Sequence, residues 1–372
     1  MEERALILDV VDELCRGVIA PRAAEIDRTG AFPHDVYQAL AEQGLLAAFV
    51  PPAHGGVEIG LETLMLVVER IARDSAACAL LVGNCGDGVG AIVHGGSDTQ
   101  LARVMPGVAD GSVVPAFCLT EPGAGSDAGA LAATARRDGD RFRITGSKLY
   151  ITNGSVAGVY TVWARTEAGV SCFLVDGGAD GLTAVRDEDL LGLRGVPATE
   201  LRFDETPGEL LGTDGEGFRL AMVTLDEARL NISAIALGTA RGALEHALEH
   251  ARVREAFGQP IIRHQGLAFL LADVVTEVAA ARALWLQAVA EVAAGLGRRA
   301  STTCAMAKNA CCNAAMRATT EAVQVLGGAG LTRDVPVERM FRDAKTFQIL
   351  DGTTQIQHLI IARHLERTGL PF

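Results

Sequence analysis

The stretch RRDGDRFRITGSKLYITNG, residues 136–154, marks the point where this chain changes from helical to β periodicity. Apolar and polar residues alternate around Asp138-Gly139, and Asp-Gly is a preferred two-residue hairpin turn. The runs VYTVWAR, VSCFLVD and ELRFDE follow, separated by glycine-rich breaks. Residues 113–213 are therefore predicted to form an antiparallel β domain.

The segments on both sides of this β region carry a helical pattern instead. VYQALAEQGLL and LETLMLVVERIARD precede it with apolar residues at three- and four-residue spacing, and longer runs of the same kind follow it. We expect a helical domain over residues 1–112 and a longer helical domain over residues 214–372. The order of helices, strands and helices indicates an α+β chain and not a βαβ winding.

Composition limits the classes of partner and compartment. The net charge of −13 argues against nucleic acid or an anionic membrane as a general partner. The N-terminus does not resemble a signal or transit peptide, and no apolar run is expected to span a bilayer, since Arg282 and Glu291 interrupt the alanine-rich stretch 277–296. Eight cysteines without a CxxC pair favour a reduced cytoplasm.

Two motifs are weak. GDGVGA at 86–91 fits a loose dinucleotide fingerprint but lacks a surrounding βαβ pattern, so close helix packing is the better interpretation. His246 and His250 stand four residues apart on a predicted helix, yet no third ligand is visible, which favours a solvated helix face. We expect no metal site.

The segment FCLTEPGAGSDAGAL, residues 117–131, has a stronger functional signal. Its proline and glycines enforce an irregular loop with free backbone N–H groups, and Thr120 and Ser126 add hydroxyls. Such a loop can hold a polar heterocycle or a phosphate-bearing chain. In GSKLYITNG, Tyr150 offers a flat face, while Thr152 and Asn153 offer hydrogen bonds at a strand end.

Five motifs in order resemble those of the acyl-CoA dehydrogenase family. They are TEPGAGSD, K-x-[aromatic]-ITNG, RxxFGxPIxxHQ, QVLGGxG and RDAKxxQIxxGT, at residues 120–127, 148–154, 254–265, 324–330 and 342–353. The resemblance implies an N-terminal α-helical domain, a middle antiparallel β-barrel domain and a C-terminal four-helix bundle.

The resemblance also implies non-covalently bound FAD, placed at an interface between subunits of a dimer or a dimer of dimers (a homotetramer). By position, the flavin contacts of the same chain are Phe117, Leu119, Thr120, Ser126, Tyr150 and Thr152. The contacts expected from the neighbouring subunit are Arg254, Phe257, Gln265, Gln324 and Gly328, completed by Thr353 and Gln355.

The substrate that the resemblance implies is an acyl thioester of coenzyme A or of an acyl carrier protein. Ser126, Asp226, Arg229 and Gly352 match positions that hold it. The electron acceptor is expected to be electron-transfer flavoprotein or a similar carrier. The acyl lining is expected near residues 84–94, where the orientation of Asp87 is left open.

Asp351 is the candidate catalytic base. From its own stretch, FQILDGTTQIQHLIIARHL at 347–365, it reads first as a helix N-cap. The resemblance instead places it where most relatives carry a glutamate that removes the α-proton. Asp is one methylene shorter, and the position that carries the base in some relatives is Ala228 here. Two alternatives stay open, namely a flavin oxidase of the nitroalkane-oxidase type, which uses an Asp base, and a non-catalytic partner subunit.

Overall fold

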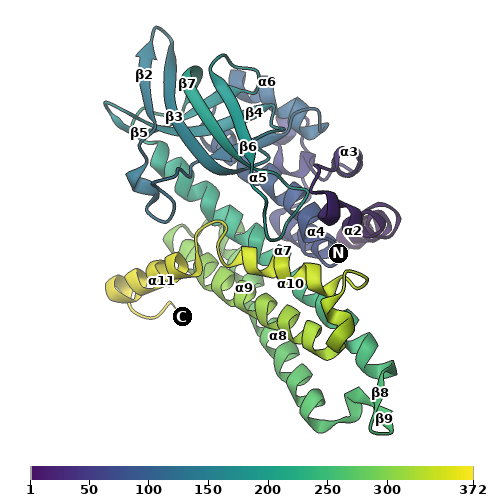
Figure 1. Ribbon diagram of the computed structural model, residues 1–372. Coiled ribbons are helices and arrows are strands. Elements are labelled where there is room, and N and C mark those ends of the chain that lie inside the picture. The colour runs from purple at the N-terminus through teal and green to yellow at the C-terminus, as the bar shows by residue number, and fades with distance from the viewer. Residues whose placement is uncertain (1, 372) are drawn as a thin grey trace.

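The computed structural model describes residues 2–371, which form a helical part, a β barrel and a second helical part (Figure 1). This arrangement confirms the predicted α+β class. The helices of the first part are α1 (Glu2–Leu14), η1 (Cys15–Ile19), α2 (Ala20–Thr29), α3 (His34–Glu42), η2 (Ala47–Phe49), η3 (Pro52–His54), α4 (Leu61–Ala72), α5 (Ala76–Gly95) and α6 (Asp98–Ala109).

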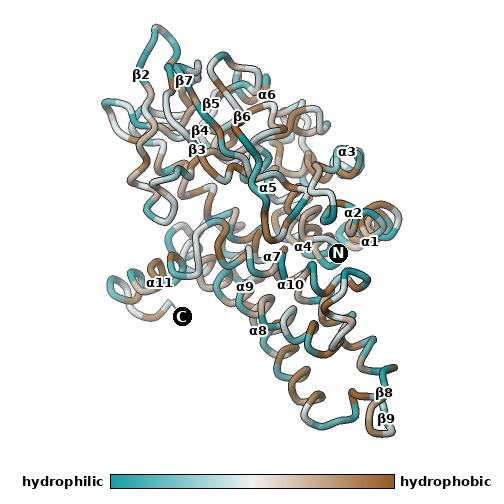
Figure 2. The backbone as a smooth tube through the Cα atoms, viewed as in Figure 1, coloured by the Kyte–Doolittle hydropathy of each residue, from teal (hydrophilic) through white to brown (hydrophobic). Residues whose placement is uncertain are grey.

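The strands of the second part close into a barrel through the pairings β4–β5–β7–β3–β2–β4. Their bounds are β1 (Pro115–Cys118), β2 (Thr134–Asp138), β3 (Arg141–Thr152), β4 (Val159–Thr166), β5 (Gly169–Asp176), β6 (Leu182–Asp187) and β7 (Ala198–Leu211), with η4 (Ala128–Ala130) after β1. The hairpin forms where it is predicted, but Asp138 pairs with Arg141, so the two turn residues are Gly139 and Asp140 and not Asp138 and Gly139. The tip of this hairpin is hydrophilic (Figure 2). The sheet is not wholly antiparallel, because β1 and β2 each pair with β4 in parallel.

The third part is built around three long helices, α7 (Gly217–Val253), α8 (Gln265–Ala293) and α9 (Arg298–Leu326). The remaining elements are η5 (Ile261–Arg263), η6 (Gly327–Leu331), α10 (Val337–Phe347) and α11 (Thr354–Thr368). One small β hairpin, β8 (Glu255–Ala256) with β9 (Gln259–Pro260), interrupts a region predicted to be helical. Phe257 and Gly258, both at positive φ, make its two-residue turn.

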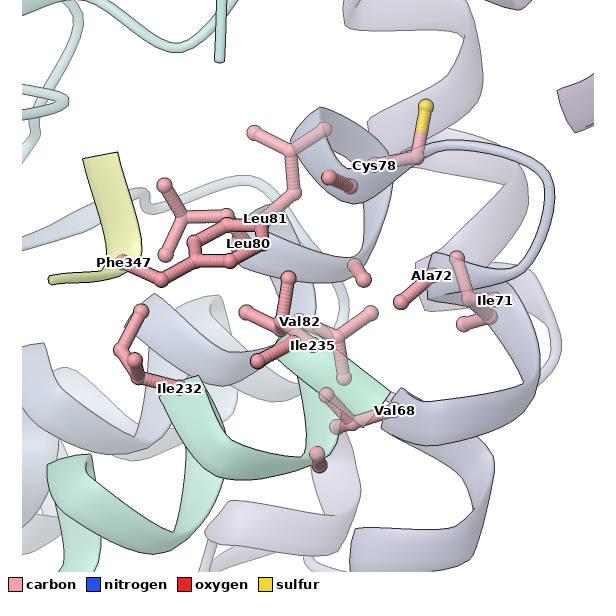
Figure 3. Close-up of a cluster of buried hydrophobic side chains, with 14 of the residues drawn as sticks. Val68, Ile71, Ala72, Cys78, Leu80, Leu81, Val82, Ile232, Ile235 and Phe347 are labelled. Carbon is pink, nitrogen blue, oxygen red and sulfur yellow. The ribbon is translucent and has the colours of Figure 1, made fainter. Parts of the chain in front are cut away.

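Helix α5 is the central core helix and corrects one expectation. It is long and apolar enough to cross a membrane, yet 89% of its most apolar window is buried inside the protein. Figure 3 shows the reason: Leu80, Leu81 and Val82 of α5 meet side chains of α4 and α7, and Phe347 at the end of α10. Apolar burial on all sides gives a core helix the same composition as a membrane span.

The glycines of GDGVGA allow this close packing, as predicted. A Cβ on Gly88 would lie 2.7 Å from Pro115, and a Cβ on Gly90 would lie 2.8 Å from Thr224 of α7. The segment is part of helix α5 and not a phosphate-binding loop between a strand and a helix. Its glycines therefore bring α5 against α7, next to the candidate site.

Candidate active site

The turn between α10 and α11 carries Asp351 in a left-handed conformation, with φ of 51°. Aspartate tolerates this conformation better than most side chains, and Gly352 continues it at φ 89°. Helix α11 begins at Thr354, and its N-cap is Thr353, whose hydroxyl accepts from the Ile356 N–H at 3.4 Å. The N-cap interpretation of Asp351 is therefore wrong, because Thr353 fills that role.

Two buried side chains hold the turn through one carbonyl. The Gly352 carbonyl accepts from Lys308 Nζ of α9 at 2.6 Å and from Gln357 Nε2 at 2.8 Å. A Cβ on Gly352 would lie 2.9 Å from that same Gln357 nitrogen. This position therefore requires glycine for two reasons, namely its positive φ and the lack of space for a side chain. The backbone around Asp351 is thus fixed by contacts and not left as a free loop.

Charge around Asp351 is mixed. Burial raises the pKa of the Asp351 carboxyl, while the positive charges of Lys308 and Arg229 act against the rise. Arg229 lies on α7 and is 4% exposed, and Lys308 is 1% exposed. A half-buried carboxylate with a raised pKa and nearby cations is an arrangement typical of a general base.

A second carboxyl faces this site. Asp87 on α5 is buried and accepts a hydrogen bond from Asn231 Nδ2 of α7 at 3.1 Å. Burial raises the pKa of Asp87 well above its usual range, and the negative charge of Asp351 raises it further. The sequence left the orientation of Asp87 open. In the structure Asp87 lies close enough to Asp351 for their charges to interact.

Two amide atoms beside Asp87 complete a polar wall. Asn84 Nδ2 and Asn231 Oδ1 are buried and find no hydrogen-bond partner among residues 2–371. Orphaned polar atoms are costly in an interior unless a water or a ligand group satisfies them. Asn84 begins the segment where the acyl lining is expected, whereas Asn231 carried no recognisable signal in the sequence.

The predicted thioester contacts on α7 form a compact network. Arg229 pairs with Asp226, which also accepts from the Ser301 hydroxyl of α9 at 2.9 Å. Arg229 Nε is buried and has no acceptor in the described part of the chain, so one donor stays available for a ligand. Ala228 is buried between them and supplies no alternative base.

The loop 119–126 is tied to strand β3 by a buried ion pair that sequence reasoning left unassigned. Lys148 Nζ lies 2.7 Å from Glu121 Oε1 and donates to the Leu119 carbonyl at 3.0 Å. Glu121 also accepts from the Ala132 N–H at 2.5 Å and the Ala133 N–H at 3.1 Å. The Leu149 N–H donates to the Thr120 carbonyl at 2.9 Å, which fixes Thr120 beside β3.

The predicted same-chain flavin contacts come together at this point. Phe117 of β1 packs on Trp163 with ring centroids 4.4 Å apart, and Leu119 is buried directly after it. Tyr150 is held at φ 58° and is 57% exposed, so its ring is free to contact a ligand. Thr152 ends β3 half-buried, whereas Ser126 is exposed on the loop.

The contacts predicted from a neighbouring subunit lie elsewhere on the chain. Arg254 and Phe257 are exposed at the β8–β9 hairpin, at the end of the molecule opposite the barrel (Figure 1). Gln265 begins α8 beside them. Because α9 runs back antiparallel to α8, its final turns with Gln324 and the following Gly328 return toward this end. The chain therefore does not bring the two groups together by itself.

These two groups fit a flavin dinucleotide divided between two chains. The barrel group offers an aromatic face and hydroxyls, and the hairpin group offers a guanidinium suited to a pyrophosphate. Phe257 is 97% exposed and contacts the His264 ring edge-on, with ring centroids 5.9 Å apart. Thr353 and Gln355 belong to neither group and lie at the start of α11, next to the Asp351 turn.

Comparisons with known proteins identify all three parts. Family models match as "Acyl-CoA dehydrogenase, N-terminal domain" over residues 1–112, "middle domain" over 116–206 and "C-terminal domain" over 215–366. The chain is 42% identical to cyclohexane-1-carbonyl-CoA dehydrogenase of Geobacter metallireducens, covering 98% of this chain and 97% of that one. It is 40% identical to cyclohex-1-ene-1-carbonyl-CoA dehydrogenase of Syntrophus aciditrophicus, and the match covers 98% of this chain and 90% of that one. The solved structure of butyryl-CoA dehydrogenase from Megasphaera elsdenii superimposes with a TM-score of 0.95 at 32% identity, covering 99% of both chains.

Proposed function

The chain belongs to the acyl-CoA dehydrogenase family, and we propose that it oxidises an acyl-CoA thioester between the α- and β-carbons with FAD as its bound cofactor. The observation that carries this proposal is the placement of Asp351. This carboxylate has no capping role, sits at left-handed φ in a turn fixed by Lys308, and faces Arg229 on α7.

In this proposal Asp351 is the general base. Its carboxylate oxygen takes the α-proton of the thioester, and its raised pKa brings the basicity of the group nearer to the working pH. Arg229 Nε, which has no acceptor among the described residues, binds a polar group of the coenzyme A portion. When bound, FAD supplies the acceptor for the β-hydride.

The substrate is proposed to be a compact acyl group of the alicyclic carbonyl-CoA kind. Two relatives at 40% and 42% identity bear names of that substrate class. The polar wall of Asn84, Asp87 and Asn231 supports it, because a long alkyl chain packed against unpartnered amides would leave them unsatisfied. A compact ring that stays near Asp351 avoids this cost.

The compartment, the oligomeric state and the electron acceptor are proposed from the resemblance to the same family. We place the protein in the cytoplasm as a homo-oligomer that passes electrons to electron-transfer flavoprotein or a similar carrier. The two separated groups of flavin contacts support the oligomer, since each is incomplete alone. An acyl-carrier-protein thioester is the alternative substrate, and Arg229 favours the coenzyme A thioester.

Asp351→Asn tests the base. Asparagine keeps the size and polarity of the side chain but cannot take the α-proton. Anaerobic flavin reduction by cyclohexane-1-carbonyl-CoA is expected to slow by about 100-fold or more while FAD stays bound. A rate within a few-fold of wild type would mean that another group takes the proton. Asp351→Glu, which adds about 1.5 Å of reach, shows whether the pocket is adapted to the shorter side chain.

An oxidase remains the second candidate because Asp351 is shorter than the usual base. The two functions differ in their electron acceptor. The dehydrogenase is expected to turn over with a ferrocenium-type dye and to form little peroxide in air. Rapid peroxide formation from a nitroalkane without added acceptor would assign the chain to the oxidase instead.

A further inference from the structure

Lys308 is a buried cation that the mechanism described above does not use. The chain has only three lysines, Lys148, Lys308 and Lys345, and the first two are buried. Lys148 pairs with the Glu121 carboxylate, whereas Lys308 makes hydrogen bonds only to backbone carbonyls. A buried ammonium without a directly bonded carboxylate is costly, so its presence in the middle of α9 calls for a physical reason.

The carbonyls that Lys308 binds enclose the catalytic turn. Nζ donates to the Phe347 carbonyl at 3.2 Å and to the Gly352 carbonyl at 2.6 Å. Residues 348–351 lie between these two anchor points, so a single ammonium group closes the turn that presents Asp351. An ammonium has three donors, and the third makes no hydrogen bond within residues 2–371.

The charged surroundings of Lys308 come from four elements. Asp351 lies on the turn, Arg229 on α7 and Cys312 on α9, while Asp87 on α5 faces Asp351 from another helix. Burial lowers the pKa of Lys308, as does the positive charge of Arg229, and the negative charge of Asp351 opposes that change. Cys312 is a neutral thiol near neutral pH, because burial raises its pKa to about 11. Lys308 in turn lowers the pKa of Asp351 against the effect of burial. The two side chains thus favour each other's charged form.

We propose that Lys308 is a positioning residue that acts through Asp351. Its two hydrogen bonds hold the turn in the geometry that aims the carboxylate, and its charge keeps that carboxylate ionised between turnovers. This inference rests on the proposed role of Asp351 as base.

Gln357 provides a matched control. It is fully buried and donates to the same Gly352 carbonyl at 2.8 Å, but it carries no charge. Lys308→Met and Gln357→Met each remove one hydrogen bond to that carbonyl with a side chain of similar length. Lys308→Met also removes the hydrogen bond to the Phe347 carbonyl and a positive charge. Because loss of an anchoring bond leaves the charge near Asp351 unchanged, the pH dependence of the rate separates anchoring of the turn from electrostatic control of Asp351.

The measurement is anaerobic flavin reduction by cyclohexane-1-carbonyl-CoA as a function of pH. A base acts only when deprotonated, so the rate rises through the pKa of Asp351. Without the Lys308 charge that pKa rises. We therefore expect the ascending limb of the pH–rate curve, the range in which the rate rises with pH, to lie about one unit higher in Lys308→Met than in wild type. At pH values below this limb, flavin reduction in Lys308→Met is expected to be about tenfold slower than in wild type. Gln357→Met is expected to lower the maximal rate without moving the limb, and Lys308→Arg to keep the wild-type limb.

A second readout does not need turnover. The infrared band of the protonated carboxyl that disappears in Asp351→Asn reports the titration of Asp351 in the resting holoenzyme. In Lys308→Met this band is expected to persist to higher pH than in wild type. FAD content and thermal midpoint show that each variant is folded, and Lys308→Gln replaces Lys308→Met if the latter does not accumulate.

Three outcomes are distinguishable. An unshifted limb and an unshifted carboxyl band in folded Lys308→Met overturn the inference and leave Lys308 as a packing residue. Equal limb shifts in Lys308→Met and Gln357→Met also overturn it, because the charge is then irrelevant. Failure of the proposed base appears separately, as normal flavin reduction in Asp351→Asn.

Discussion

Asp87 and Asp351 give the candidate site two carboxyl groups whose ionisations depend on each other. Lys308 and Arg229 support the negative charge of Asp351, whereas Asp87 has only the Asn231 amide as a favourable partner. Asp351 therefore ionises first, and Asp87 holds its proton to higher pH because a second negative charge nearby is unfavourable. Between the two ionisations the pair carries one proton.

Asp87→Asn tests this coupling. Asparagine keeps an oxygen for the Asn231 N–H but cannot titrate. Difference titration of the holoenzyme should show that wild type releases one more proton than the variant, at a pH above the usual aspartate range. In Asp351→Asn the ionisation of Asp87 should move to lower pH, since the repelling charge is gone. Identical proton release in wild type and Asp87→Asn would show that Asp87 does not titrate with Asp351.

The residues of the site differ in how visible they are in the sequence. Asp351 lies within a recognisable motif and Arg229 matches a position that the family resemblance assigns to the substrate, so both were accessible before the fold. Lys308 was not, because a lone lysine in the alanine-rich run CAMAKNACC gives no sign of the carbonyls that it meets 39 and 44 residues later. Excluding the cap interpretation of Asp351 also needed coordinates, since Asp351 and Thr353 are both good capping residues and the hydrogen bond from the Ile356 N–H identifies Thr353 as the cap.

At the scale of elements, helix α10 leads into the turn that carries Asp351, and charged residues of α10 fix this helix to other parts of the fold. Arg342 makes paired bonds to Asp27 of α2 at 2.7 and 2.8 Å. Asp343 is buried and accepts from the Leu193 N–H of the β6–β7 loop at 2.6 Å. Helix α10 thus contacts both the N-terminal part and the barrel just before the turn that carries Asp351.

Asp343→Asn is predicted to flatten the dependence of stability on pH. Burial raises the pKa of Asp343 to about 6, above the value of 3.8 expected in the unfolded chain. The folded state therefore holds this proton more tightly, and its stabilising contribution is complete below pH 3.8 and lost as pH rises through about 6. From pH 4 to pH 7 wild type should lose about 2 kcal/mol more unfolding free energy than Asp343→Asn. Denaturant melts at the two pH values measure this difference, and parallel losses in both proteins would contradict it.

Element types were predictable where periodicity was strong, and topology was not. The Asp138-Gly139 hairpin follows from turn chemistry, and the long helices follow from their apolar spacing. The parallel pairing of β1 with β4 joins strands that are about 40 residues apart, and no local signal encodes it. The glycines of helix α5 are a related case, because the residues that require them, such as Pro115 and Thr224, lie on other elements.

At the scale of the whole molecule, we propose that two chains share the flavin site. Strand β3, which carries Tyr150, belongs to the barrel, whereas the β8–β9 hairpin, which begins directly after Arg254 and has Phe257 in its turn, lies at the opposite end of the molecule (Figure 1). Replacing Arg254 with alanine should therefore weaken FAD binding and loosen the assembly together. Size-exclusion chromatography with flavin absorbance follows both properties.

Mixed oligomers of two inactive variants give the sharpest test of a shared site. In an Arg254→Ala and Asp351→Asn heterodimer, one site combines Asp351 of the first chain with Arg254 of the second and is intact, while the other site carries both defects. Co-expression with two different tags should recover up to about half of the wild-type activity per FAD-binding pair, because intact and doubly defective sites form in equal number. Each variant co-expressed with itself should stay near background, even with added FAD. If each chain instead builds its whole site alone, every site in the mixture carries one defect, and the mixed oligomer stays as inactive as its parents.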